Sequence, residues 1–255
     1  MILIPATLFL SAVMALAWVA QRRLRNAGWV DAFWTFGLGS AGVVVALTGG
    51  AGPRRCLVAA LVGAWALRLG SHIVARSRGA PEDSRYAHFR AEWGADFERR
   101  IFVFLQIQAA AAALLLVPIL VAAASPRPVG WIDAVAVAIA IAACAGEGIA
   151  DRQLHAFRSD PRNHGRVCDT GLWAWSRHPN YVFEWLHWWA YPLLALGTPW
   201  AVLTLIGPAF MYWLLVHVSG IPPLEAQMLR SRGDAYRAYQ QRVNAFLPFP
   251  KGSTR

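Results

Sequence analysis

Polar side chains recur at helical spacing in the C-terminal third of the chain. Asn180, Glu184 and His187 are separated by four and three residues, which places them on one face of a helix. Pro179, directly before them, suits the first turn of that helix. A helix cap at Asn180 and a first-turn acid at Glu184 are the simplest structural explanations. They fit Glu184 and His187 poorly, because both fall in a short apolar stretch rich in tryptophan, so the segment is predicted to line a binding site.

A second polar stripe precedes this segment at spacings of four, four and three residues. Its members are Glu147, Asp151, His155 and Arg158. They share one helical face, which is either a solvated surface or the lining of a cavity. Glu147 lies inside an apolar run, and this favours the cavity.

Two charged residues lie within apolar runs of the N-terminal half. Asp31 is near the start of one run, and Arg68 lies deeper in the next, with His72 one turn later. A charge inside a membrane span costs several kcal/mol (about 3) unless it is paired or hydrated, so each is a candidate for a functional site. The structural alternatives are snorkelling for Asp31 and, for Arg68, an ion pair that fixes helix packing, for example with Asp31.

The elements that would position these groups are membrane helices. Of the 255 residues, 57% are hydrophobic and 15% charged, whereas about a quarter of a soluble domain is charged. A helical span needs about 20 apolar residues, and seven runs qualify. They are roughly 2–20, 29–49, 56–74, 101–124, 130–150, 181–197 and 200–218. The sequence therefore predicts an all-α, polytopic membrane helix bundle of about seven transmembrane helices in a single membrane domain.

The distribution of arginine predicts the orientation of this bundle. Arginines gather in loops 21–28, 75–100 and 151–180 and in the tail after 218, whereas the opposite connections contain only Arg54, Arg55 and Arg127. Since cytoplasmic loops of membrane proteins are enriched in Lys and Arg, the N-terminus is predicted outside and the C-terminus in the cytoplasm. The same distribution accounts for the net charge of +10 without a nucleic-acid partner.

Cysteine usage supports neither a disulfide framework nor a metal site. Cys56, Cys144 and Cys168 are far apart and include no Cys-x-x-Cys pair. We expect all three to be small, buried apolar residues, and we expect no bound metal.

The segment GLWAWSRHPNYVFEW, followed by SGIPPLEAQM and YRAYQQRVNAFLPFP, resembles the bacterial membrane-protein family of unknown function 1295 (DUF1295), in the steroid 5-alpha-reductase-like group. The resemblance is specific over about 147–250 and looser over 28–100. Sterol C14 and C7 reductases and isoprenylcysteine carboxyl methyltransferases share the Arg-His-Pro-x-Tyr and Glu…Tyr…Pro pattern. The reductases use NADPH and the methyltransferases use S-adenosylmethionine, so the resemblance implies a cytoplasm-facing cofactor pocket and leaves both cofactors open.

The resemblance also assigns residues. Asp151, Arg158 and Arg166 match positions near the NADPH adenosine and phosphates, and Asn180 and Glu184 match positions beside the nicotinamide half. The full set implied for cofactor binding is Glu147, Asp151, His155, Arg158, Arg166, Arg177, His178, Asn180, Tyr181, Glu184, Glu225, Tyr236 and Tyr239.

The substrate half departs from the family pattern. Steroid reductases hold the substrate ketone with a membrane glutamate and a tyrosine, and no clean pair of this kind is visible in the sequence. The candidates for polarising a substrate are Asp31, Arg68 and Tyr86. Residues 1–124 would then form the substrate-side helices, and residues 125–255 the cofactor-binding part.

Charge favours NADPH over S-adenosylmethionine. The loop 151–180 carries five arginines, and guanidinium groups bind phosphates well, although a cytoplasmic loop would carry arginines in any case. The expected function is reduction of a conjugated C=C bond in an apolar, steroid- or isoprenoid-like enone that enters from the membrane. The alternative is an S-adenosylmethionine-dependent methyltransferase of a lipidic substrate. A transporter or scaffold is the third hypothesis, but the sequence lacks paired inverted segments.

The expected environment follows from these features. We expect a multi-pass protein of the bacterial cytoplasmic membrane, surrounded by membrane lipids and without an obligate protein partner.

Overall fold

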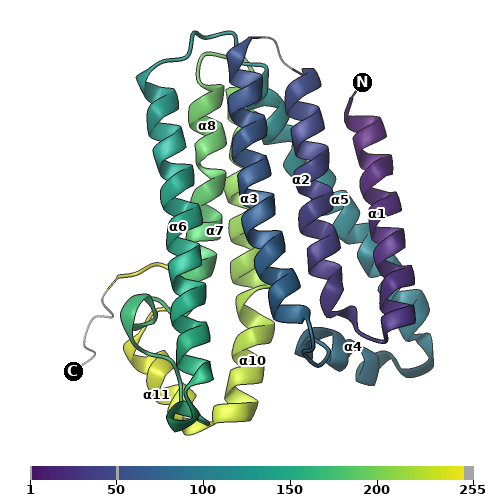
Figure 1. The fold of residues 1–255 in the computed structure, drawn as a ribbon, viewed down its shortest axis with the longest axis vertical. Helices are drawn as coiled ribbons and strands as arrows, with labels where there is room; N and C mark the ends of the chain where they lie inside the picture. The colour runs from purple at the N-terminus through teal and green to yellow at the C-terminus, as the bar shows by residue number, and fades with distance from the viewer. Residues whose placement is uncertain (1, 50–51, 250–255) are drawn as a thin grey trace. The chain divides into compact units, whose positions relative to one another are not determined.

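The computed structural model describes residues 2–49 and 52–249, and every regular element within them is a helix (Figure 1). The α-helices are α1 Leu3–Leu24, α2 Val30–Gly49, α3 Pro53–Ser77, α4 Ser84–Trp93, α5 Phe97–Ala123, α6 Trp131–Ser159, α7 Pro179–Trp188, α8 Ala190–Ala195, α9 Ile206–Trp213, α10 Ile221–Arg232 and α11 Asp234–Arg242. Six helical segments of the described chain are long and apolar enough to cross a membrane. The chain is therefore an integral, multi-pass membrane protein, as predicted.

The predicted sixth span, 181–197, is divided between two short helices. Helix α7 ends at Trp188, and α8 begins at Ala190. Pro192 explains the break, because proline has no N–H to donate and its ring clashes with the carbonyl four residues earlier, here that of Trp188. The described chain thus has six long apolar helices rather than seven. Residues 179–195 together still cover about 25 Å if helical, close to the length of one span.

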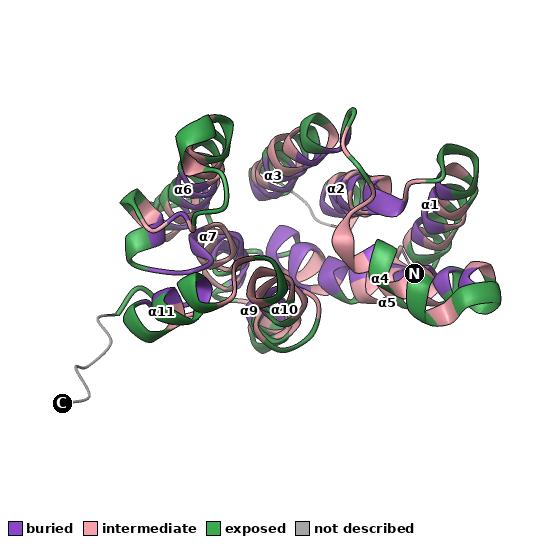
Figure 2. Ribbon diagram, turned by 90° about the horizontal axis from the view of Figure 1, so that it is seen from below, coloured by how far each residue is buried: buried purple, intermediate pink, exposed green. Residues whose placement is uncertain are grey.

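The chain forms two compact units. The first unit comprises Met1–Ala136 and Tyr191–Gly207, and the second comprises Val137–Ala190 and Pro208–Arg255. In the first unit, α1, α2, α3 and α5 pack side by side (Figure 1). Helix α2 carries many of the buried residues, whereas α1 is largely exposed (Figure 2).

Small residues let α2 and α3 approach each other closely. A Cβ added to Gly39 would lie 2.1 Å from the Cβ of Ala66. A Cβ added to Gly70 would lie 2.5 Å from the ring of Phe36. Without a hydrophobic driving force in lipid, such close backbone contact is a main source of helix association.

One end of the first unit is held by a buried arginine near the start of α3. Arg54 donates through Nε and Nη2 to the two carboxylate oxygens of Asp133, at 2.9 and 3.1 Å. Its Nη1 donates to the carbonyl and hydroxyl of Ser125 and to the carbonyl of Arg127, and Nη2 also reaches the carbonyl of Pro128. All three guanidinium nitrogens of Arg54 are therefore hydrogen-bonded.

In the second unit, the last apolar segment is interrupted just beyond the run predicted at 200–218. A π-helical turn covers Leu214–Val218, and α10 starts at Ile221 with prolines in its first turn. Gly220 joins them, and a Cβ at this position would lie 2.4 Å from the carbonyl oxygen of Leu215. Only glycine fits this junction without a shift of the backbone.

Candidate functional site

In the first unit, the structure brings together two of the three predicted catalytic residues. Asp31 lies in the first turn of α2. The Tyr86 hydroxyl donates to one of its carboxylate oxygens at 3.1 Å, and Nη2 of Arg85 donates to the other at 2.5 Å. Tyr86 is buried, and the side chains of Asp31 and Arg85 are each 23% exposed. Sequence analysis found no acid–tyrosine pair because 54 residues separate Asp31 from Arg85 and 55 separate it from Tyr86.

The loop before α4 places Arg85 and Tyr86 beside Asp31. The Ala27 N–H donates to Glu82 at 3.0 Å, which fastens this loop to the segment before α2. Arg90, in the last turn of α4, donates to the same Glu82 carboxylate at 2.9 and 3.1 Å. Asp83 caps α4 by accepting from the Arg85 N–H at 3.0 Å. These contacts hold the first turn of α4 in place, and none of them involves the Asp31 carboxylate.

Two carboxylates in this loop, those of Glu82 and Asp83, stay ionised at lower pH than usual. Burial opposes the effect, but hydrogen bonds from Arg90 and from the Ala27 N–H hold the pKa of Glu82 below its ordinary value. Burial also opposes it for Asp83, where the charge and hydrogen bonds of Arg85 hold the pKa below its ordinary value. The loop is therefore most secure when both carboxylates are charged.

Gln108 of α5 belongs to the same cluster and was missed by sequence analysis. The Trp34 Nε1–H donates to its backbone carbonyl at 3.1 Å, and its side chain interacts with Tyr86. Its amide oxygen is buried and has no hydrogen-bond partner within the described residues. A glutamine inside the apolar run 101–124 was the available signal. We call Asp31, Arg85, Tyr86 and Gln108 the Asp31 cluster.

Arg68, the third predicted catalytic residue, lies on α3 and is partly buried. Trp65, one turn before it, is fully buried. Asp31 forms its ion pair with Arg85, which sequence analysis had counted only among the loop arginines.

In the second unit, the Arg-His-Pro segment is joined to the C-terminal part of the chain. Arg177 donates through Nε to Glu225 at 2.6 Å and through Nη1 to the carbonyls of Val243 and Gln240, at 2.5 and 3.3 Å. Its own N–H donates to the carbonyl of Asn244 at 2.9 Å. Gln240 donates to the second oxygen of Glu225 at 2.8 Å. Arg177 therefore fastens the loop before α7 to the end of α11.

Neighbouring residues complete this fastening. His178 Nε2 lies 3.2 Å from Glu225, and its ring stacks on Tyr181 with centroids 5.5 Å apart. Burial, together with the charge of Arg177, holds the pKa of His178 below its ordinary value, although Glu225 favours the protonated ring. His178 is therefore neutral over a wider pH range than an exposed histidine.

Of the three tyrosines predicted to touch cofactor, Tyr236 and Tyr239 are buried and Tyr181 is partly buried. The Tyr239 hydroxyl donates to the carbonyl of Trp173 at 2.5 Å. Tyr236 and Tyr239 form a small core with Val243. Burial raises the pKa of both phenols well above their ordinary value. These contacts give the two tyrosines a structural role in holding α11.

Helix α7 carries buried polar groups, as its spacing suggested. Glu184 and His187 are both buried, and the Trp188 Nε1–H donates to Glu184 at 3.2 Å. Asn180, in the first turn of α7, is partly buried.

The stripe on α6 passes from buried to exposed. Glu147 is buried and Asp151 partly so, whereas His155 and Arg158 are exposed in the part of α6 that extends beyond residue 150. Arg166, in the following loop, is also exposed.

The arginines of this loop differ in their partners. Arg162 forms an ion pair with Asp160 at 2.7 Å, while the nearest described partner of the Arg166 guanidinium is the neutral Asn163 side chain at 3.4 Å. Over the described ranges, no group of three or more His, Cys, Asp or Glu residues could hold a metal ion. Cys168 is buried as expected, but Cys56 is exposed and Cys144 partly exposed.

Comparison with known proteins gives one family and one relative. The profile of the family described as "Protein of unknown function (DUF1295)" matches residues 17–243. A fission yeast protein (Schizosaccharomyces pombe), described as uncharacterized protein C594.04c, is 36% identical over 100 residues. That match covers 38% of this chain and 28% of the yeast protein. No solved structure matches the chain.

Proposed function

Because this chain belongs to the DUF1295 family of steroid 5-alpha-reductase-like membrane proteins, and because its first unit contains the Asp31 cluster, we propose that it is an NADPH-dependent reductase. Its substrate class is an apolar lipid with a conjugated C=C bond, such as a steroid- or isoprenoid-like enone. The proposal includes a location in the bacterial cytoplasmic membrane and substrate entry from the lipid phase.

The observation that carries the proposal is the pairing of Asp31 with Tyr86. An acid–tyrosine pair is what the family resemblance required for holding a substrate carbonyl, and these two side chains lie 3.1 Å apart. Arg85 supplies a guanidinium whose Nη1 has no hydrogen-bond partner in the described part of the chain. Donors held rigidly beside a carbonyl stabilise the negative charge that develops on its oxygen during reduction.

The second unit has groups that suit a phosphorylated dinucleotide. Arg158 and Arg166 are exposed guanidinium groups of the kind that bind phosphate, and Asp151 offers a carboxylate for ribose hydroxyls. Asn180 and Glu184 would orient the nicotinamide half. Arg177 is committed to Glu225 and to main-chain carbonyls, so we assign it to holding the site rather than to phosphate.

NADPH, when bound, supplies a hydride. In the net reaction, the hydride adds to one carbon of the C=C bond and a proton adds to the other, giving a saturated ketone and NADP⁺. The protein's own groups polarise the acceptor and exclude water, as is general for cofactor enzymes. Tyr86 would deliver or relay the proton, with Asp31 accepting from its hydroxyl and Arg85 holding the Asp31 carboxylate.

Ligand-dependent stabilisation tests the cofactor. NADPH at a concentration about 100-fold above its Kd should stabilise the protein in mild detergent by about 2.7 kcal/mol. Asn180→Ala and Glu184→Gln should abolish that stabilisation, whereas Gln241→Ala, an exposed change in the second unit, should not. Consumption of NADPH with a steroid 4-en-3-one as the probe then tests the reaction.

The rival functions give different results in the same experiment. Stabilisation by S-adenosylmethionine and not by NADPH would overturn the reductase proposal in favour of a methyltransferase. Stabilisation that survives both Asn180→Ala and Glu184→Gln would mean that α7 does not bind the cofactor. That result would favour a transporter or scaffold.

A further inference from the structure

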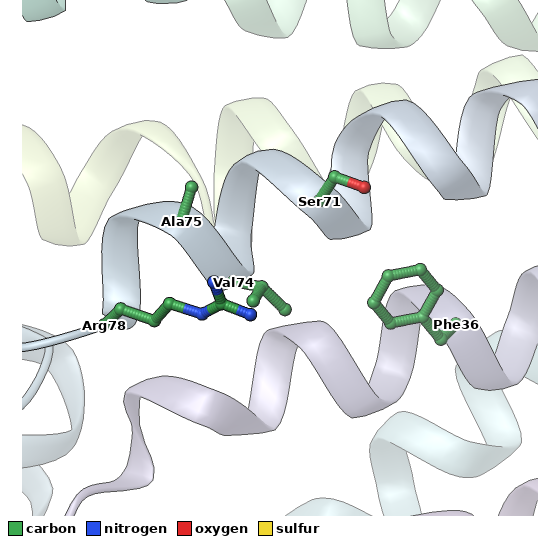
Figure 3. A pocket seen from close by; sticks show the side chains of 5 residues that line it. All are labelled: Phe36, Ser71, Val74, Ala75 and Arg78. Atoms are coloured by element: carbon green, nitrogen blue, oxygen red, sulfur yellow. The ribbon is translucent and has the colours of Figure 1, made fainter.

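A groove runs along α3 in the first unit, separate from the Asp31 cluster. Its volume is about 400 Å³, within the range of small-ligand pockets. Ser71, Val74, Ala75 and Arg78 line it from α3 and its C-terminal end, and Phe36 lines it from α2 (Figure 3). Ser71 and Arg78 are seven residues apart, so the groove follows α3 for about 10 Å.

The groove arises from the way α2 meets α3. The Phe36 ring packs against Gly70, where any added Cβ would collide with it. Ser71 follows Gly70, and Ala75 lies one turn further along α3. Both side chains are small and exposed, so they leave this surface of α3 open. The result is an open, largely apolar groove with the Phe36 ring of α2 on one side and α3 on the other.

Arg78 gives the groove its charge. It is exposed, and Figure 3 shows its side chain lying back along α3 toward Val74. No ion pair or hydrogen bond of its guanidinium is present within the described ranges. Its neighbour Arg76 differs, since it lies 3.9 Å from Asp83. Arg78 is thus a cation at the mouth of an apolar groove without an anion from this unit.

We propose that this groove binds an anionic phospholipid, with the phosphate at Arg78 and part of one acyl chain between Phe36 and α3. Charge complementarity selects this occupant. A guanidinium pairs with phosphate through two parallel hydrogen bonds, and the apolar lining excludes a headgroup from the rest of the groove. The predicted orientation places this end of α3 at the cytoplasmic leaflet, whose anionic lipids attract basic residues near the membrane surface.

Binding of matched lipids to the full-length protein in mild detergent tests the proposal. Phosphatidylglycerol should bind and raise Tm, whereas phosphatidylcholine with the same acyl chains and inorganic phosphate alone should not. Arg78→Gln should weaken phosphatidylglycerol binding at least roughly tenfold, because the charge-assisted pairing with the phosphate is lost. Arg23→Gln removes an exposed arginine elsewhere in the same unit and should leave binding unchanged.

A second variant fills the groove without changing the charge. Ala75→Phe should abolish binding, while Ala64→Phe, on an exposed part of α3 outside the groove, should not. Equal binding of both lipids, or phosphatidylglycerol binding that survives both Arg78→Gln and Ala75→Phe, would overturn the proposal. Stabilisation by inorganic phosphate alone would also overturn it, because the acyl chain would then have no part in recognition.

Discussion

Two arginine–aspartate pairs of the first unit differ in their burial and in how completely the polar groups around them are hydrogen-bonded. Arg54 and Asp133 are almost completely buried, with side chains 2% exposed, and every guanidinium nitrogen of Arg54 is hydrogen-bonded. Arg85 and Asp31 are each 23% exposed. Nη1 of Arg85 has no partner among the described residues, and the buried amide oxygen of Gln108 lies unsatisfied in the same cluster.

The difference separates a structural pair from a candidate chemical one. A buried ion pair is tolerated in a fold when its hydrogen bonds are complete, and Arg54 meets that condition. Polar groups that stay unsatisfied reduce stability, so a cluster that keeps them is expected to meet a ligand. The comparison predicts that damage to the Arg54 pair reduces stability, while damage to the Asp31 cluster reduces activity.

The largest expected effect on stability is at Arg54. Arg54→Ala leaves Asp133 buried without its main partner and should lower the free energy of unfolding by about 3–5 kcal/mol. Equilibrium unfolding in mild detergent measures this. The exposed neighbour provides the control, because Arg55→Ala should have no measurable effect. A loss below about 1 kcal/mol for Arg54→Ala would contradict a structural role for the Arg54–Asp133 pair.

Asp31→Asn should give the largest effect on activity. The change keeps the shape of the side chain but removes the charge that holds Arg85 and Tyr86, and a roughly 100-fold loss of reductase turnover is expected. Asp133→Asn should instead lower Tm and leave turnover per folded molecule unchanged. The two variants would be assayed side by side, and a loss of turnover in both at equal Tm contradicts the assignment.

Gln106 and Gln108 lie two residues apart on α5, and replacing them by leucine should change the free energy of unfolding in opposite directions. Gln108→Leu removes a buried unsatisfied oxygen and should raise the free energy of unfolding by about 1 kcal/mol while lowering turnover about tenfold. Gln106→Leu should lower the free energy of unfolding by about 1 kcal/mol, because Ser11 loses the acceptor that lies 2.6 Å from its hydroxyl. Destabilisation by both changes would mean that Gln108 is a structural residue.

Acid should produce the smallest effect, at the loop that positions Arg85. The pKa of Glu82 is lower in the folded protein than in the unfolded chain, so its contribution is complete above about pH 4.3 and is lost as pH falls through the folded value. Tm should therefore fall as pH drops below about 5, and Glu82→Gln should reduce that fall. Glu92→Gln, an exposed change on α4, should leave the pH dependence as it is in the wild type.

Most of the fold was predictable because membrane helices follow from local composition. The apolar runs correctly predicted the positions of α1, α2, α3, α5 and α6, and the run 200–218 ends shortly before α10 begins. The division of 181–197 was missed, because hydropathy counts Pro192 as one residue in an apolar run and does not register its missing N–H.

The candidate site was predictable only where its residues are neighbours in the sequence. Helical spacing identified Asn180, Glu184 and His187 within one short helix. Arg85 and Gln108 were missed because their proximity to Asp31 depends on how the loop before α4 folds back and how α5 packs on α2. Whether these groups act on a substrate is decided by the variants above.

The contacts of Arg177 also have a consequence for biosynthesis. Its partners Gln240 and Val243 are made 63 and 66 residues after it, near the end of the described chain. The ribosome therefore releases α7 into the membrane before the residues that fasten the preceding loop exist. The second unit can complete its folding only after residue 243 has been synthesised, and a truncation before residue 240 should leave the protein open to quality-control proteases.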